Sequence, residues 1–207
     1  MRDDADLLDA WRLGDRGAAK TLFDRYFVAI TRFFANKLGR DIDDMVQKTF
    51  EALVKGRDRI SSTSSFRSYL FGIAHNVLRS HLRTLARARR IELTTTSFHD
   101  LGMDAETLVA NTEEQRLILE GLRRIPIESQ IVLELYYWEE LSVAELAEVI
   151  EIRPGTVKSR LHRARKQLKK ALERLARTRA LFESTATRLD DWARELGKAV
   201  RRRPAGA

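Results

Sequence analysis

The stretch LSVAELAEVIEIRPGTVKSRLHRARKQL, residues 141–168, decides the fold of this chain. Ser142 is followed three residues later by Glu145, the spacing at which a hydroxyl and a carboxylate cap the first turn of a helix. Apolar residues then recur at helical spacing until Pro154 interrupts the run. The pattern predicts a short helix, a turn and a second helix whose first turn is capped by Thr156.

The second predicted helix has an almost uniformly cationic outer face. No acidic residue occurs from Thr156 to Ala171, whereas a solvated helix usually alternates charges to gain i,i+4 pairs. A bare positive face repels itself unless phosphates neutralise it. A plain solvated face is the alternative, but the pattern favours a helix-turn-helix whose second helix enters the major groove of DNA.

Composition excludes several classes of protein. The 207 residues are 43% hydrophobic and carry a formal net charge of +8, which favours a polyanionic partner. There is no Cys, the four His residues lack ligand spacing, and no Gly-rich phosphate loop or nucleophile motif is seen. No apolar run is long enough for a bilayer span or a secretory signal. We therefore expect a cytoplasmic non-enzyme without metal or cofactor.

Helical periodicity dominates the chain, and Pro occurs only three times, so we expect an all-α protein of two small domains. The expected boundaries are a first domain over 1–84, a flexible linker over 85–112 and a second domain over 113–175 that ends in the helix-turn-helix. One amphipathic helix is expected over 176–207. In the first domain, a helix from residue 18 to 38 is expected to contribute core aromatics: Phe23, Tyr26, Phe27, Phe33 and Phe34.

Two further motifs precede the helix-turn-helix. DIDDMVQKTFEAL, residues 41–53, has acids in its first turn, and FRSYLFGIAHNVLRSHLR, residues 66–83, combines aromatic and basic residues. Together with the helix-turn-helix, and in this order, they resemble the extracytoplasmic-function (ECF) sigma factors of bacterial RNA polymerase. That family carries D-x-E-D-x-V-Q-x-x-F, F-R-x-W-L-x-x-I-A-x-N and G-T-V-K-S-R-L-x-R-A-R-x-x-L. The resemblance covers most of residues 7–175.

The resemblance implies a specificity subunit that directs core polymerase to promoters and assists strand separation. The implied partners are the core enzyme, through its largest-subunit coiled coil and its flap, promoter DNA, and an anti-sigma factor or other regulator. No membrane insertion is implied, and the polymerase-bound protein is expected at the nucleoid.

The acidic motif is, by the same resemblance, the surface that binds the polymerase coiled coil. Clustered carboxylates suit an Arg-rich partner helix. Lys48 stands where the family commonly has Glu, which weakens this match, and phosphorylation of the neighbouring Thr49 is a hypothesis for how binding is controlled. The residues assigned to this surface are Asp41, Asp43, Asp44, Gln47 and Lys48.

Two sets of residues are assigned to DNA. An unstacked base of the minus-ten element needs a loop pocket, and an amide beside cations combines base-edge and phosphate contacts. This set is Arg59, Ser61, Ser62, Asn76, Arg79 and Arg83. For the minus-thirty-five element, base edges are expected nearest Lys158, Ser159, His162 and Arg163. Phosphate-side or flanking positions are Thr156, Arg160, Arg165 and Lys166.

Other functions remain open at this point. A self-sufficient helix-turn-helix regulator would use the first domain for dimerisation or sensing, and an interaction module sequestered by an anti-sigma partner would contact DNA only incidentally. The residues after 175 are expected to pack on their own domain, with Trp192 in a leucine stripe. The alternatives for them are a groove otherwise used by an anti-sigma factor and a separate regulator site.

Overall fold

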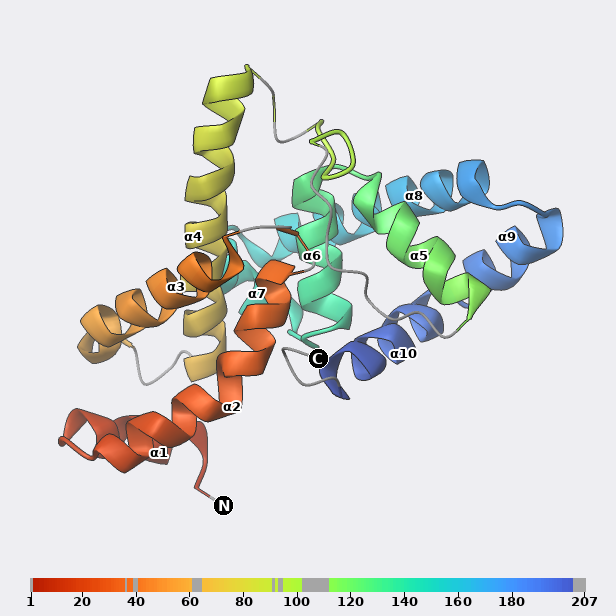
Figure 1. Ribbon diagram of the computed structural model, residues 1–207. Coiled ribbons are helices and arrows are strands. Elements are labelled where there is room, and N and C mark those ends of the chain that lie inside the picture. The colour runs from red at the N-terminus through yellow and green to blue at the C-terminus, as the bar shows by residue number, and fades with distance from the viewer. Residues whose placement is uncertain are drawn as a thin grey trace.

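The computed structural model describes residues 2–35, 37–38, 41–60, 65–90, 92, 95–101 and 112–202. In these ranges the chain is helical, and the only β pairing is an isolated bridge between Ser97 and Pro126. Figure 1 shows an N-terminal domain of α1–α4 beside a C-terminal domain of α5–α8, followed by the C-terminal extension, α9 and α10. The all-α, two-domain prediction is confirmed.

The N-terminal domain begins with an antiparallel helix pair. Asp3 caps the first helix through the amide of Asp6, at 2.8 Å, and Gly14 adopts the positive φ of 100° that the turn requires. Ser65 caps the last helix through the amide of Ser68, at 3.0 Å. The elements are α1 (Asp4–Arg12), α2 (Arg16–Ala35), α3 (Ile42–Gly56), the 3₁₀ turn η1 (Arg57–Arg59) and α4 (Phe66–Arg89).

The core of this domain lies between α2, α3 and α4. Leu22, Phe34 and Phe71 are fully buried there. Gly56 lies where α3 meets α4, and a Cβ at this position would lie 2.3 Å from the Tyr69 hydroxyl, so a side chain here would displace Tyr69. Phe27 departs from the expectation that the α2 aromatics are all core, since its side chain is 49% exposed.

The C-terminal domain contains the predicted helix-turn-helix. Its elements are α5 (Glu113–Arg123), α6 (Ile127–Tyr137), α7 (Val143–Val149) and α8 (Pro154–Leu175). The capping box of Ser142 and Glu145 is present, with backbone-to-side-chain distances of 2.8 and 3.2 Å. The predicted cap at Thr156 is wrong. The helix starts at Pro154, because proline has no amide to leave unpaired and its φ is preset for the first turn.

Two described parts of the expected linker are structured. Helix α4 continues to Arg89, beyond the boundary expected at residue 84. Farther along, the His99 amide donates to the Arg123 carbonyl and the Ile127 amide to the Thr96 carbonyl, both at 3.0 Å. Phe98 is buried. Residues 95–101 are therefore docked on the C-terminal domain.

The C-terminal extension forms two helices rather than the single one expected. They are α9 (Arg179–Thr187) and α10 (Leu189–Arg202), separated at Arg188. The break lets α9 contact α5 and α8 while α10 packs on α5 and α6, so Ala193 is buried and Trp192 half-buried. The expected packing on its own domain is confirmed. No described helix has both the length and the apolar character to cross a bilayer.

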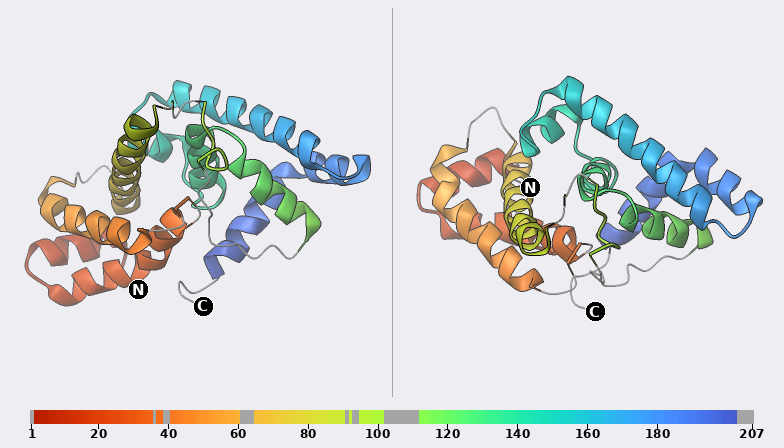
Figure 2. Two further views of the ribbon diagram at one scale, coloured as in Figure 1. Left: turned by 45° about the horizontal axis from the view of Figure 1, so that its top comes forward. Right: turned by 90° about the horizontal axis from the view of Figure 1, so that it is seen from above.

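The two domains contact each other mainly through α4 and α7. Figure 2 shows α8 running along the outer side of the molecule, whereas α4 and α7 lie side by side where the two domains meet. The two helices assigned to DNA therefore have different surroundings.

Candidate nucleic-acid and protein interfaces

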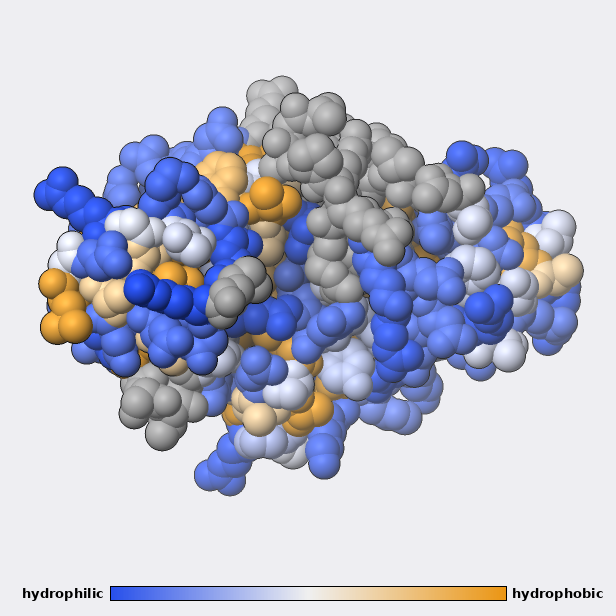
Figure 3. Space-filling model, turned by 90° about the horizontal axis from the view of Figure 1, so that it is seen from below, coloured by the Kyte–Doolittle hydropathy of each residue, from blue (hydrophilic) through white to orange (hydrophobic). Residues whose placement is uncertain are grey.

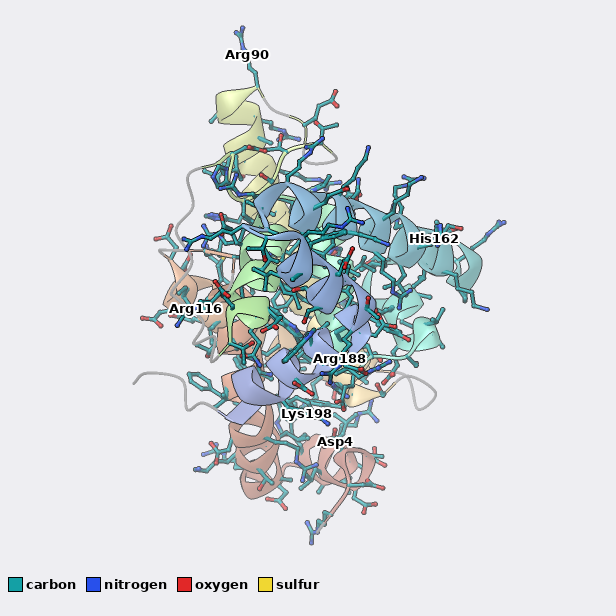
Figure 4. The ribbon with its side chains drawn as sticks, turned by 90° about the vertical axis from the view of Figure 1, so that its right-hand side faces the viewer. Asp4, Arg90, Arg116, His162, Arg188 and Lys198 are labelled. Carbon is teal, nitrogen blue, oxygen red and sulfur yellow. The ribbon has the colours of Figure 1, made fainter. Side chains whose placement is uncertain are left out.

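Helix α8 presents its cations to solvent because its apolar stripe is buried on the opposite side. Val157, Leu161, Ala164 and Leu168 form that stripe and are all buried. His162 lies on the outer side of the helix (Figure 4). The four residues expected nearest base edges are exposed on this face: Lys158, Ser159, His162 and Arg163. Thr156 and Lys166, which flank them, are also exposed.

Arg160 and Arg165, on the same helix, are half-buried and engaged with other helices. Arg160 lies 3.7 Å from the Glu128 carboxylate of α6, and the Arg165 Nε donates to the Tyr137 hydroxyl at 2.7 Å. Both cations had been assigned to phosphates. Their positions are set by the domain itself, unlike those of Arg163 and its exposed neighbours.

Helix α4 carries Asn76, Arg79 and Arg83 as exposed side chains on one side. The Asn76 amide donates to the Glu151 carboxylate of the C-terminal domain at 3.2 Å, so this side of α4 already has a protein partner. Arg59 is exposed in η1. Ser61 and Ser62, also assigned to the minus-ten element, lie outside the described residues.

Two ion pairs join the domains beside this contact. Lys37 is 1% exposed and bonds Glu134, which is 3% exposed, and Arg32 Nη2 lies 2.8 Å from Glu139 Oε1. Burial lowers the pKa of Lys37 and raises the pKa of Glu134, while their mutual attraction opposes both shifts. The Phe33 carbonyl also accepts from Lys37 Nζ at 2.7 Å.

Neither ion pair was found from the sequence. Lys37 and Glu134 are 97 positions apart, and helical periodicity gives no signal for a partner at that separation. A weak signal exists in Glu134, which interrupts the otherwise apolar run IVLELYY of α6. A carboxylate inside such a run needs a cation when it is buried.

A cavity of ≈ 170 Å³ lies at the same domain boundary. His75 and Arg79 of α4 line it, opposite Glu128, Glu151 and Arg160 of the C-terminal domain. Burial, followed by the charge of Arg79, lowers the pKa of His75 to about 4. The neutral form of His75 therefore fits this interface and the charged form opposes it.

The acidic surface on α3 is exposed as expected. Asp41, Asp43, Asp44, Gln47 and Lys48 are all accessible to a partner. The Lys48 ammonium lies 2.6 Å from Asp44 Oδ2 within the helix, so it neutralises part of the surface rather than standing alone. Thr49 is fully buried and its hydroxyl donates to the Met45 carbonyl at 2.8 Å, so a kinase cannot reach it in this conformation.

An apolar groove borders this acidic surface and was not recognised from the sequence. It has a volume of ≈ 650 Å³, and Asp43 and Gln47 form part of its edge. Phe27 and Val54 are each about half exposed in it. The available signal is a pair of i,i+4 apolar spacings outside the main core stripes, Phe23 with Phe27 and Phe50 with Val54.

The surface seen in Figure 3 is mainly hydrophilic, with separate apolar areas between charged residues. Exposed apolar residues are normal on a soluble protein when they are scattered. The groove is different because its apolar residues line one continuous hollow beside carboxylates.

Comparison with known proteins identifies both domains. Residues 22–88 match the model of Sigma-70 region 2, and residues 115–168 match that of Sigma-70, region 4. The RNA polymerase sigma factor HrpL of Pseudomonas syringae pv. syringae is 30% identical over 139 residues, covering 66% of this chain and 76% of HrpL. The ECF RNA polymerase sigma factor SigM of Mycobacterium tuberculosis is 29% identical, covering 83% of this chain and 85% of SigM.

Solved structures with the same fold include two chains bound to other proteins. CnrH, in complex with the cytosolic domain of CnrY, has a TM-score of 0.60 at 24% identity over 84% of this chain and 99% of CnrH. RpoE of Bartonella quintana, in complex with the anti-sigma factor NepR, has a TM-score of 0.58 at 20% identity over 76% of this chain and 98% of RpoE.

The region 2 match contains the acidic surface, η1 and all but the last residue of α4, and the region 4 match contains the helix-turn-helix. The chain belongs to the sigma-70 family of RNA polymerase sigma factors, in its ECF group, and functions in transcription initiation.

Proposed function

We propose that this sigma factor divides its work among three surfaces. Helix α3 and the adjoining groove bind the coiled coil of the largest polymerase subunit. Helix α4 and the loop before it read and open the minus-ten element. Helix α8 reads the minus-thirty-five element.

The observation that carries the proposal is the outer face of α8. Lys158, Arg163 and Lys166 are exposed on a helix whose opposite side is buried. Within α8, no acidic residue occurs before Glu173. Arg pairs with guanine through two hydrogen bonds, and Ser159 is able to bond several bases. Phosphates along the major groove would neutralise these clustered cations, which repel one another in water.

The α3 surface supports the proposed binding to core polymerase. Three carboxylates offer ion pairs to an Arg-rich helix, and the groove with Phe27 and Val54 offers apolar area to the same helix. Charges at such a rim steer association, whereas apolar burial supplies most of the affinity. Lys48 reduces the net charge but remains paired with Asp44.

In this proposal, α4 binds single-stranded promoter DNA only after the domains separate. Asn76 bonds Glu151 and Arg79 faces the interdomain cavity, so promoter DNA and the C-terminal domain compete for one side of α4. Two weak DNA contacts become strong when both sit on one rigid scaffold, because the second is then intramolecular. Core polymerase supplies that scaffold in this proposal.

The decisive experiment is in vitro transcription with purified core polymerase on a library of random promoter sequences. We expect initiation from a subset of templates with two shared elements. Asp43→Asn together with Asp44→Asn lowers core binding and transcription. Asp24→Asn is the matched control, because Asp24 is an exposed carboxylate on α2 that pairs only locally with Lys20.

A self-sufficient DNA-binding regulator is the rival function, and the same experiment distinguishes it. Tight, specific duplex binding by the protein alone, with no initiation when core is added, would select the regulator. Specific initiation that depends on Asp43 and Asp44 selects the sigma factor with the proposed surfaces.

An anti-sigma factor is a further proposed partner, since the similar chains CnrH and RpoE were solved with bound partner proteins. The exposed apolar groove on α2 and α3 is the surface that we assign to it. A partner in the groove would exclude the polymerase coiled coil. Cytoplasmic localisation, with association to the nucleoid through polymerase, completes the proposal.

A further inference from the structure

The C-terminal extension reaches a cation of the DNA-reading helix. Arg165 of α8 donates its Nε hydrogen to the Tyr137 hydroxyl at 2.7 Å. That hydroxyl donates to the Asp190 carboxylate of α10, which also lies 3.8 Å from Arg165 Nε. Three helices therefore meet at one guanidinium.

The same guanidinium lies over two aromatic rings. The Arg165 Cζ lies 5.3 Å from the centroid of Tyr136 and 5.4 Å from that of Tyr137, while Arg194 of α10 lies over the Tyr137 ring at 5.8 Å. Rings at these distances attract a cation. Burial, together with the bond to Asp190, raises the pKa of Tyr137 to about 12, so the phenol remains a donor at neutral pH.

Neighbouring cations on α8 have no such restraint. Arg163 and Lys166 are exposed, and neither side chain forms an ion pair or a hydrogen bond to another described residue. These two side chains are therefore free to turn toward the nearest phosphate or base. The charge of Arg165 is instead shared with Asp190.

We infer that Asp190 and Tyr137 are positioning residues for Arg165, and that the C-terminal extension is thereby part of the minus-thirty-five surface. The inference rests on the proposed DNA contact of α8. Asp190 competes with phosphates for Arg165, which limits the attraction of this helix to DNA of any sequence. Discrimination then depends more on Arg163 and Lys158, which reach base edges.

Removing the carboxylate releases one cation toward the DNA backbone. One additional phosphate contact increases the slope of log affinity against log salt by about 0.9. Near 0.15 M salt this slope corresponds to roughly fivefold tighter binding of nonspecific duplex. Specific duplex gains no more than nonspecific duplex, so discrimination does not improve.

The test uses holoenzyme assembled from core polymerase and the full chain, with salt titrations on two fluorescent duplexes. One duplex carries a minus-thirty-five element selected in the transcription library, and the other carries the same bases scrambled. Asp190→Asn is expected to tighten binding of the scrambled duplex roughly fivefold and to increase the slope of log affinity against log salt by about 0.9. Asp190→Glu retains the charge and restores wild-type behaviour.

Asp191→Asn is the matched control. Asp191 is the next residue of α10 and is exposed, but it pairs within its own helix, with Arg188 at 3.7 Å and Arg194 at 4.0 Å. The Asp191→Asn holoenzyme is expected to bind both duplexes with wild-type affinity. Arg165→Ala combined with Asp190→Asn abolishes the gain, because the released cation is missing.

Tyr137→Phe provides a second route if Asp190→Asn fails to fold by circular dichroism. It keeps the ring and removes the hydroxyl that joins Arg165 to Asp190, so it raises the salt slope in the same direction. Equal slopes for Asp190→Asn, Asp191→Asn and wild type would overturn the inference, as would a gain in slope that persists when Arg165→Ala is combined with Asp190→Asn. A holoenzyme that does not prefer the selected duplex contradicts the proposed function instead.

Discussion

The two helices that we propose to contact DNA, α4 and α8, differ in what covers them. Helix α8 turns its exposed cations to solvent, whereas α4 has the C-terminal domain against the side that carries Asn76 and Arg79. In the proposed function this conformation leaves the α8 surface free for DNA, whereas Asn76 and Arg79 of α4, although exposed, already face the C-terminal domain. Under the proposed function we therefore expect promoter opening to require a separation of the domains, whereas duplex contact by α8 does not require one.

The contrast is strengthened by what holds the domains together. Lys37 and Glu134 are almost completely buried, so each depends on the other for its charge. A buried pair contributes little net stability over an apolar pair, but loss of one partner is costly. The interface is thus sensitive to single changes that leave either domain intact.

Glu134→Ala is expected to have the largest effect. The substitution leaves Lys37 buried without its carboxylate, which disfavours the closed arrangement by about 3 to 5 kcal/mol. Separation returns Lys37 to water, so the individual domains remain folded. The measurement is the distance between nitroxide labels at Ser80→Cys and Ala144→Cys, on exposed positions of α4 and α7.

The chain contains no cysteine, so these two thiols are the only labelling sites. Glu148→Ala is the control, because Glu148 is an exposed carboxylate on α7 whose side chain forms no hydrogen bond or ion pair with the described part of the N-terminal domain. It keeps the short distance. An unchanged distance in Glu134→Ala would show that the ion pair does not hold the domains.

Acid is expected to open the chain through His75. The pKa of His75 is about 4 in the closed form and near 6.5 when the residue is exposed. The closed form is fully favoured above pH 6.5 and loses up to about 3 kcal/mol as the pH falls toward 4, because only the open form takes up the proton readily. Arg79, Arg160, Lys37 and Glu151 supply the surrounding charges.

The label distance, measured from pH 7 to pH 5, checks this expectation. Wild type shows a growing long-distance population, and His75→Gln shows less change because its amide does not titrate. If both proteins respond equally, another group controls the acid response.

Much of this architecture could be predicted from the sequence because it depends on local signals. The Ser142–Glu145 capping box, the apolar stripe of α8 and the acidic start of α3 each lie within a few consecutive turns. All were confirmed. Exposure of the residues assigned to α8 and α3 follows from the same periodicity.

The contacts between distant elements could not be predicted in this way. Pairing of Lys37 with Glu134, docking of Phe98, and the Arg165–Tyr137–Asp190 cluster depend on how whole helices pack. Helical period indicates which face is buried but not which helix covers it. Phe27 was misassigned for the same reason, since its neighbour on that side is an open groove.

Arg163→Ala sharpens the comparison on the exposed helix. Its removal is expected to lower discrimination between promoter and scrambled duplex by roughly 1 to 3 kcal/mol, because a base-edge partner is lost. Lys166→Ala weakens both duplexes alike, as a phosphate contact does. Holoenzyme binding to the two duplexes measures the difference, and equal sequence-independent losses contradict the assigned roles.

Glu151→Ala has the smallest expected effect, and it tests the covered helix. The exposed bond to Asn76 contributes no more than about 1 kcal/mol to closure, so transcription remains near wild type or rises slightly. Asn76→Ala loses the same bond and also the proposed minus-ten contact, so open-complex formation falls. Comparable losses of transcription in the two variants would assign the defect to the domain contact rather than to DNA.

The most direct test of the central claim is the Ser80→Cys to Ala144→Cys label distance in the free protein and in the holoenzyme. We expect a single short distance in the free protein and a clearly longer one after core polymerase binds, with transcription retained. A distance that stays short in a holoenzyme that initiates transcription would contradict the claim that α4 must be uncovered before it reaches promoter DNA.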